Sequence, residues 1–283
     1  MLLEVKLWAL SDLHVRYAET RAALERIGDH GQDWVILAGD IGETEEHLEW
    51  TLALFQRRFA KVLWVPGNHE LWGVTSRGPG KLDGPVKYEA MVALCRARGV
   101  ATPEDPFLVW PGAGQPTTIA LCFVGYDYSF RPAEVPLEQA LDWAAETGVR
   151  CTDESMITPA PFPSMIEWCQ ARVRLTESRL AAIPADHRTV LVNHFPLRHD
   201  LVWIPRVPRF SIWCGTTLTE DWHRRFRASV VVSGHLHVRS GQLRDGVRFE
   251  EVSLGYPQQY DVEKGPQRYL RLVLPELGSG GPA

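Results

Sequence analysis

The residues best suited to chemistry lie in five short clusters, and each cluster follows an apolar run. The clusters are Asp12-x-His14, Gly39-Asp40, Gly67-Asn68-His69-Glu70, Asn193-His194 and Gly234-His235-x-His237. Such polar groups are costly to bury unpaired, so a polar partner is implied. The carboxylates, amide and imidazoles form a mixed oxygen and nitrogen donor set that Mn, Fe or Zn accept, and the lack of thiolates argues against a structural zinc site.

The spacing within the clusters favours a shared cavity. Alternate residues on an extended segment point the same way, so Asp12 with His14, and His235 with His237, can each reach a common centre. Two ions a few ångströms apart need one shared ligand, and a carboxylate is able to bridge. Asp40 is the natural choice, so the sequence predicts a centre of two metal ions.

These clusters, in this order, resemble the calcineurin-like metallophosphoesterase superfamily, whose pattern is D-x-H, G-D, G-N-H-E, a lone His and G-H-x-H. The match runs from Asp12 to His237, which is most of the chain. The resemblance implies a four-layer αββα sandwich of two mixed sheets flanked by helices. It also implies one metal ion held by Asp12, His14, Asp40 and His237, and another held by Asp40, Asn68, His194 and His235.

The same resemblance implies hydrolysis of a phosphoester. A water that bridges two metals has its pKa lowered towards neutrality, and the metals offset charge on the phosphate oxygens. His69 is the expected general acid for the leaving oxygen. Glu43 stands where some relatives carry an acid that orients this His, although a solvent-facing helix start is the alternative. Glu70 is expected to support its neighbours.

The segment 195–215 contains three prolines and is too long for a plain connector, which favours a role in binding. Arg206, Arg209 and His199 are the candidate substrate contacts in it, because a guanidinium can hold a phosphate through two hydrogen bonds. Arg198 is a further candidate. Solubilising surface charge is the alternative, just as packing is the alternative to substrate contact for Trp72, Trp203 and Trp213.

Four longer blocks of sequence favour one class of substrate. The blocks are FAKVLWVPGNHELW at 59–72, YDYSF at 126–130, SIWCGTT at 211–217 and DGVRFEEV at 245–252. They resemble the actinobacterial phosphopantetheinyl hydrolases, which cleave the phosphodiester between 4′-phosphopantetheine and the Ser of an acyl carrier protein. This resemblance implies that a small acidic carrier protein is the partner.

Other substrates stay open. The residues after Asp40 lack the Asp-Arg-Gly of the superfamily's protein phosphatases, which weakens that alternative. A nucleotide or cyclic-nucleotide phosphodiesterase, or a small-molecule phosphomonoesterase, remains the main alternative. A domain that binds a partner and has lost catalysis is a third hypothesis, although every expected metal ligand and His69 are intact.

The elements that must position these clusters follow from periodicity. Strands are predicted at 5–11, 34–38 and 62–65, and they alternate with helices at 20–28 and 43–59. This alternation favours parallel βαβ units, whose ligands gather beyond the carboxyl ends of the strands. Later elements are helices at 88–98, 137–146 and from Ser164, strands at 107–110, 118–124, 189–192 and 230–232, and a hairpin turned at Asp245-Gly246.

Length and composition indicate the number of domains, the kinds of partner and the cellular compartment. The 283 residues, 45% of them hydrophobic, favour a single domain over 1–275 with a disordered tail at 276–283. The net charge of -5 has no basic block behind it, so nucleic acid and membranes are unlikely partners. We find no signal peptide and no membrane-spanning window. Five cysteines without a C-x-x-C pair fit reduced, buried thiols in a cytoplasmic enzyme.

Overall fold

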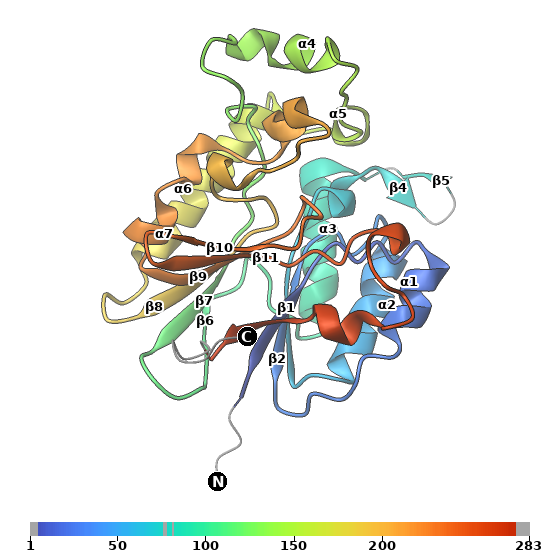
Figure 1. Ribbon diagram of the computed structural model, residues 1–283, viewed down its shortest axis with the longest axis vertical. Helices are drawn as coiled ribbons and strands as arrows, with labels where there is room; N and C mark the ends of the chain where they lie inside the picture. Colours follow the sequence, from blue (N-terminus) through green and yellow to red (C-terminus); the bar gives the residue numbers. More distant parts are fainter. Residues whose placement is uncertain (1–4, 76–77, 81, 276–283) are drawn as a thin grey trace.

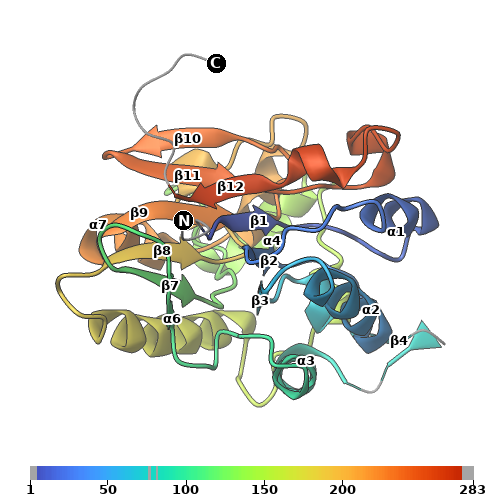
Figure 2. The same ribbon diagram turned by 90° about the horizontal axis from the view of Figure 1, so that it is seen from below.

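The computed structural model describes residues 5–75, 78–80 and 82–275 of the chain, so the tail expected at 276–283 lies outside the described residues. Two β-sheets lie face to face, and helices cover the outer face of each sheet (Figures 1 and 2). Both sheets mix parallel and antiparallel strands. This is the expected four-layer αββα sandwich.

The first sheet carries the N-terminal clusters. Its strand order is β12-β1-β2-β3. The strands are β1 (Leu7–Leu10), β2 (Trp34–Ala38), β3 (Lys61–Val65) and β12 (Arg271–Leu274). The first three are parallel, connected through α1 (Ala18–Leu24) and α2 (Glu45–Gln56), whereas β12 runs antiparallel to β1. The predicted strands and the βαβ units are confirmed, although α1 ends four residues before Gly28.

The second sheet has the order β10-β11-β9-β8-β7-β6. Its strands are β6 (Leu108–Val109), β7 (Thr117–Leu121), β8 (Arg188–Val192), β9 (Ala228–Ser233), β10 (Gly241–Arg244) and β11 (Val247–Glu251). The predicted hairpin joins β10 to β11. Its turn residues Asp245 and Gly246 both have positive φ, 51° and 76°, as a type I′ turn requires.

The remaining helices are α3 (Gly84–Ala97), α4 (Ala140–Ala145), α5 (Asp153–Met156), α6 (Met165–Ala181) and α7 (Trp222–Arg225). Helices α3, α4 and α6 were predicted from the sequence, whereas the short helices α5 and α7 were not. The Ser164 side chain accepts a hydrogen bond from the backbone N–H of Glu167 and caps α6, so the predicted start of this helix is confirmed. The predicted start of α3 at Tyr88 is wrong, because Pro85 lies in the first turn of the helix, where its missing N–H costs no hydrogen bond.

Short elements fill the connections. A two-stranded ribbon, β4 (Val74–Thr75) and β5 (Gly78–Pro79), lies between β3 and α3 in the chain. Turns of 3-10 helix cover His69–Leu71, Leu137–Gln139, His199–Leu201, Pro208–Trp213, Thr217–Thr219, Pro257–Gln259 and Pro266–Tyr269. No helix among the described residues is long and apolar enough to cross a membrane.

An aliphatic layer between the sheets holds them in register. Ile36 and Leu63 of the first sheet and Val190, Val192 and Val230 of the second are 0% exposed. Each such side chain contributes roughly 1.5–3 kcal/mol on burial. The five cysteines are buried free thiols, as expected. The packed sheets therefore form a rigid base for the loops at their edges.

Candidate metal centre

All five clusters lie at the carboxyl ends of parallel strands. They follow β1, β2 and β3 in the first sheet, and β8 and β9 in the second. Because the two sheets are stacked, these ends meet at one edge of the sandwich, where ligands of α/β folds gather.

The donor atoms converge in three overlapping groups. The groups are Asp12, His14 and His237; His14, Asp40 and His69; and Asp40, His194 and His235. Within each group the candidate ligand atoms lie within 4.8 Å of one another. Asn68 joins the last group, since its Oδ1 is 3.2 Å from Nδ1 of His235. Asp40 belongs to two groups, which agrees with the expected bridging carboxylate.

The chemistry of this donor set fits cations. The Nε2 atoms of His14 and His237 face each other at 3.2 Å. Nε2 of His194 is buried 3.4 Å from the Asp40 carboxylate and has no hydrogen-bond partner within the described part of the chain. Facing imidazole nitrogens and unpaired buried nitrogens are costly unless a proton or a metal ion lies between them. The residues present can therefore hold two metal ions.

A surrounding layer of hydrogen bonds orients the donors. Nδ1 of His194 contacts the Ala38 carbonyl at 2.9 Å, and Nδ1 of His237 contacts Oε1 of Gln259 at 2.8 Å. The other nitrogen of each ring is thereby aimed at the centre. Ser253 donates to Oδ2 of Asp12 at 2.7 Å. Gln259 and Ser253 were missed from the sequence, because each lies alone in a remote turn or bridge without a motif.

The backbone at the centre is locally strained. Positive φ values occur at Asp12 (54°), His14 (45°), Asp40 (52°), His235 (72°) and His237 (54°). Non-glycine residues in this region cost of order 1–3 kcal/mol each, and they cluster at functional sites. A Cβ at Gly67 would stand 2.1 Å from Oδ1 of Asp40. Gly67 is therefore needed for the two loops to approach.

Glu70 ties two ligand loops together. Its carboxylate accepts hydrogen bonds from the backbone N–H groups of Asp40 (2.9 Å), Ile41 (2.6 Å), Gly42 (3.2 Å) and Gly67 (2.6 Å). Burial and the neighbouring Asp40 raise the pKa of Glu70 to about 7, against the lowering effect of the backbone donors. Glu70 supports its neighbours, as expected.

His69 lies at the rim with Glu43 behind it. Its Nδ1 is 3.4 Å from Oε1 of Glu43, and its Nε2 points towards Asp40, 3.9 Å from Oδ2. Burial alone lowers the pKa of His69, but the carboxylates of Asp40 and Glu43 outweigh it and raise the pKa. Glu43 is 4% exposed, so the alternative of a solvent-facing helix start is wrong.

A cavity of about 320 Å³ opens above the donors. Its lining comprises Asp40, Asn68, His69, Ile204, Val207, Phe210, His235, Leu236, His237, Tyr256 and Gln259. Tyr256 stacks on His14, with ring centroids 4.5 Å apart. The long segment 195–215 thus does reach the centre, but with apolar side chains.

The charged candidates of that segment have other positions. Arg209 lies over the Trp143 ring and pairs with Glu146 at 2.6 Å, and His199 stacks on Phe130. Neither lines the cavity, because the 3-10 turns of the segment direct them towards α4 and the 126–130 block. The exposed Arg206 does not line it either, and its contact with substrate stays a prediction.

The other candidate substrate contacts, Arg198 and the three tryptophans, also differ in their distance from the centre. Arg198 pairs with Asp200 at 2.7 Å, outside the cavity lining. Trp203 is 68% exposed, whereas Trp213 is buried and donates to Glu154 at 2.6 Å. Trp72 stacks directly on His69, with ring centroids 3.8 Å apart. Of the tryptophans proposed for stacking, only Trp72 lies beside a reactive group.

Comparison with known proteins agrees with this geometry. The calcineurin-like phosphoesterase family matches residues 5–239. The chain therefore belongs to this family of phosphoester hydrolases.

One relative, PptH of Mycobacterium tuberculosis, is similar to this chain both in sequence and in structure. The [acyl-carrier-protein] phosphodiesterase PptH of Mycobacterium tuberculosis is 45% identical over 275 residues, which cover 96% of this chain and 84% of that protein. The crystal structure of phosphopantetheinyl hydrolase (PptH) from Mycobacterium tuberculosis superposes with a TM-score of 0.91 at 44% identity over 99% of both chains. A further solved structure, 12% identical with a TM-score of 0.53 over 95% of this chain, shares the fold alone.

Proposed function

We propose that this chain is a dimetal phosphodiesterase that removes 4′-phosphopantetheine from holo acyl carrier protein and returns the carrier to its apo form. The carrying observation is the convergence of the Asp12, Asp40, Asn68 and histidine donors on one strand edge, with His69 beside them. The likeness to PptH over nearly the whole chain supports the carrier protein as substrate.

The donor groups divide into two proposed sites that share Asp40. Asp12, His14, Asp40 and His237 would hold one ion, and Asp40, Asn68, His194 and His235 the other. The oxygen and nitrogen donors suit Mn, Fe or Zn. Two such ions supply a hydroxide nucleophile near neutral pH and offset charge on the phosphate oxygens.

His69 is the proposed general acid. Glu43 contacts Nδ1, which leaves Nε2 facing the centre, and the carboxylates of Asp40 and Glu43 raise the pKa of His69, which favours the protonated imidazole. As the hydroxide oxygen bonds to phosphorus, the bond from phosphorus to the carrier's seryl oxygen breaks. The Nε2 proton passes to the seryl oxygen, which leaves as a neutral hydroxyl. General acid help of this kind is typically worth ~10²–10⁴ in rate.

The cavity wall suits the arm of the substrate. Ile204, Val207 and Phe210 present an apolar surface next to the donors. The pantetheine arm is part apolar and part amide, so its hydrocarbon can pack on this wall while the phosphodiester lies at the metals. The five free thiols fit an enzyme of the cytoplasm, where carrier proteins would be met.

The test uses purified protein, Mn²⁺ and a holo acyl carrier protein, with the intact mass of the carrier as the readout and His69→Ala as the control. We expect the carrier to lose the mass of phosphopantetheine with the unaltered enzyme only. An unchanged carrier, together with hydrolysis of nucleotide diesters, would instead favour a phosphodiesterase of diffusible substrates.

A further inference from the structure

A buried carboxylate outside the five clusters contacts a proposed metal ligand on the side away from the metal site. Asp153 belongs to the short helix α5, which lies between β7 and α6 in the chain, and it is 1% exposed. Its Oδ1 accepts two hydrogen bonds, from Nδ2 of Asn68 at 2.9 Å and from Nε1 of Trp72 at 2.7 Å. One oxygen atom is thus shared by a proposed metal ligand and by the ring stacked on the proposed general acid.

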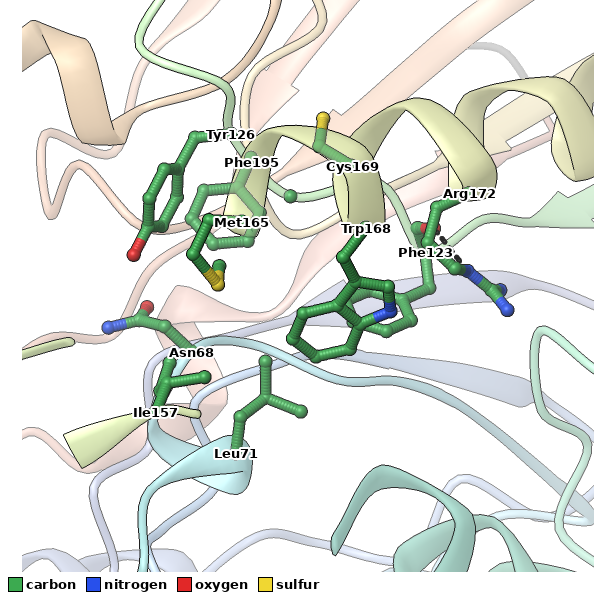
Figure 3. Close-up of a pocket in the computed structure, with 11 residues that line it drawn as sticks. Asn68, Leu71, Phe123, Tyr126, Ile157, Met165, Trp168, Cys169, Arg172 and Phe195 are labelled. Carbon is green, nitrogen blue, oxygen red and sulfur yellow. Dashed lines mark hydrogen bonds between the residues drawn. The ribbon is translucent and has the colours of Figure 1, made fainter. Parts of the chain in front are cut away.

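The surroundings of Asn68 make this contact decisive for its orientation. Figure 3 shows the Asn68 amide at the border of a cavity, on the side lined by Tyr126, Ile157 and Met165. An amide offers an acceptor at one end and two donors at the other. Oδ1 of Asp153 accepts from the Trp72 indole, which can only donate, so the same oxygen accepts from the Asn68 NH₂ group and leaves Oδ1 of Asn68 facing His235 at 3.2 Å. A flipped amide would present donors to a cation.

Trp72 gains a fixed orientation from the same oxygen. Its indole stacks on the His69 ring with an interplanar angle of 29°, while its N–H is held by Asp153. The carbonyl of Trp72 also accepts a hydrogen bond from the buried Lys87. His69 therefore lies between Glu43 on one side and a ring with a fixed tilt on the other.

Helix α5 is itself anchored, so the position of Asp153 is defined. The Met156 carbonyl accepts from Gly73 N–H at 2.9 Å, next to Trp72. Glu154 accepts from the Tyr128 hydroxyl at 2.9 Å and from Nε1 of Trp213 at 2.6 Å. These contacts link α5 to the His69 loop and to the segment that carries Phe210.

We infer that Asp153 is a positioning residue, which sets the orientation of the Asn68 amide and the Trp72 ring and thereby one metal site and the general acid. The inference rests on the proposed dimetal function. It assigns Asp153 the role of a hydrogen-bond acceptor behind a ligand, a kind of contact whose loss typically costs about 10–100-fold in metal affinity or activity.

The test measures Mn²⁺ binding to the metal-free protein by calorimetry, so that it needs no substrate. Asp153→Ala removes the acceptor, and we expect the affinity for one of the two Mn²⁺ equivalents to fall about 10–100-fold while the other stays unchanged. Asp153→Asn keeps an acceptor oxygen and should bind both equivalents within about threefold of the wild type. Ser155→Ala, at an exposed position of the same helix, is the matched control.

Two results would overturn the inference. The first is wild-type binding of both equivalents by Asp153→Ala, and the second is an equal loss in Asp153→Asn. If Asp153→Ala does not fold, Asp153→Ser, whose hydroxyl is too short to reach both donors, carries the same expectations. Failure of the proposed substrate would leave all of these measurements intact, so the two ideas are tested separately.

Discussion

At the scale of single residues, the centre depends on side chains held in positions that cost free energy. Left-handed backbone at Asp12, Asp40 and His235 aims the donors inwards, and Glu70 and Asp153 fix the loops around them. This is the arrangement expected when ligand geometry is set by the fold before metal binds. Substitutions here should alter metal binding or proton transfer more than overall stability.

His69→Ala should depend on the leaving group. With a holo carrier protein, whose leaving group is an alkoxide, we expect kcat to fall by ~10²–10⁴, because an alkoxide must be protonated as it leaves. With a bis(4-nitrophenyl) diester the loss should be much smaller, since nitrophenolate leaves without a proton. Steady-state kinetics on both substrates provide the measurement, and equal losses would contradict the role of general acid.

Gly67→Ala should lower the number of metal ions bound per chain. The added Cβ would meet Oδ1 of Asp40 at 2.1 Å and its backbone N at 2.6 Å, so the bridging carboxylate must move. We expect fewer than two metal ions per chain by atomic emission after purification in Mn²⁺. Gly125→Ala is the control, because nothing lies within 4 Å of its Cβ. Full loading of the Gly67 variant would show that the approach of the two loops is not required.

At the scale of elements, a partly buried polar contact joins helices of different layers. Oε1 of Glu104 accepts from the Tyr88 hydroxyl on α3 at 2.6 Å and pairs with Arg172 on α6 at 2.7 Å. Burial raises the pKa of Glu104, but Arg172 and the Tyr88 hydroxyl outweigh it and lower the pKa. The contact links the outer helices of the two sheets.

Glu104→Gln should lower stability in a pH-dependent way. A carboxyl whose pKa is lower in the folded state stabilises that state above its unfolded pKa, and the contribution disappears as pH falls through the folded pKa. The carboxylate is partly exposed, so we expect a loss of about 1 kcal/mol at pH 7, or about 2–4 °C in Tm. The difference should start to shrink below the ordinary Glu pKa of about 4.3 and disappear below the lower folded pKa.

Thermal unfolding at several pH values measures this effect. Glu89→Gln, an exposed change on α3, is the matched control and should leave Tm unchanged. A Tm difference for Glu104→Gln that persists undiminished at low pH would exclude the charge as its cause.

Val207→Asp tests the wall formed by the segment 195–215. Val207 lines the cavity and is 44% exposed, so the substitution is compatible with the fold. We expect a higher KM for the holo carrier protein, because the wall loses apolar contact with the pantetheine arm and gains a negative charge near a phosphate. Hydrolysis of a small aryl diester should change much less. An unchanged KM for the carrier would place the arm elsewhere.

At the scale of the whole molecule, the sequence predicted the features encoded in short segments and missed the contacts between segments that are far apart in the chain. The donors of the five clusters and the strands before them are encoded together, so short windows predicted both. Asp153 and Gln259 contact metal-ligand side chains from elements that are remote in sequence. Strand β12 was not predicted, and with four residues it is too short for a clear alternating pattern. Their roles arise from tertiary packing, which no local pattern records.

The substrate contacts illustrate the same limit. Charge alone favoured Arg209 and His199, whereas packing gave those side chains other partners and directed apolar residues of the same segment to the cavity. In an irregular segment, the direction of each side chain is set by neighbours such as Trp143 and Phe130. Periodicity predicts direction only where a helix or strand imposes it.

The most direct test of the account is an anomalous difference map from crystals grown with Mn²⁺. We predict two peaks a few ångströms apart, one contacted by Asp12, His14 and His237 and the other by Asn68, His194 and His235, with Asp40 between them. A single peak, or metal bound away from Asp40, would contradict the dimetal centre on which the proposed hydrolysis depends.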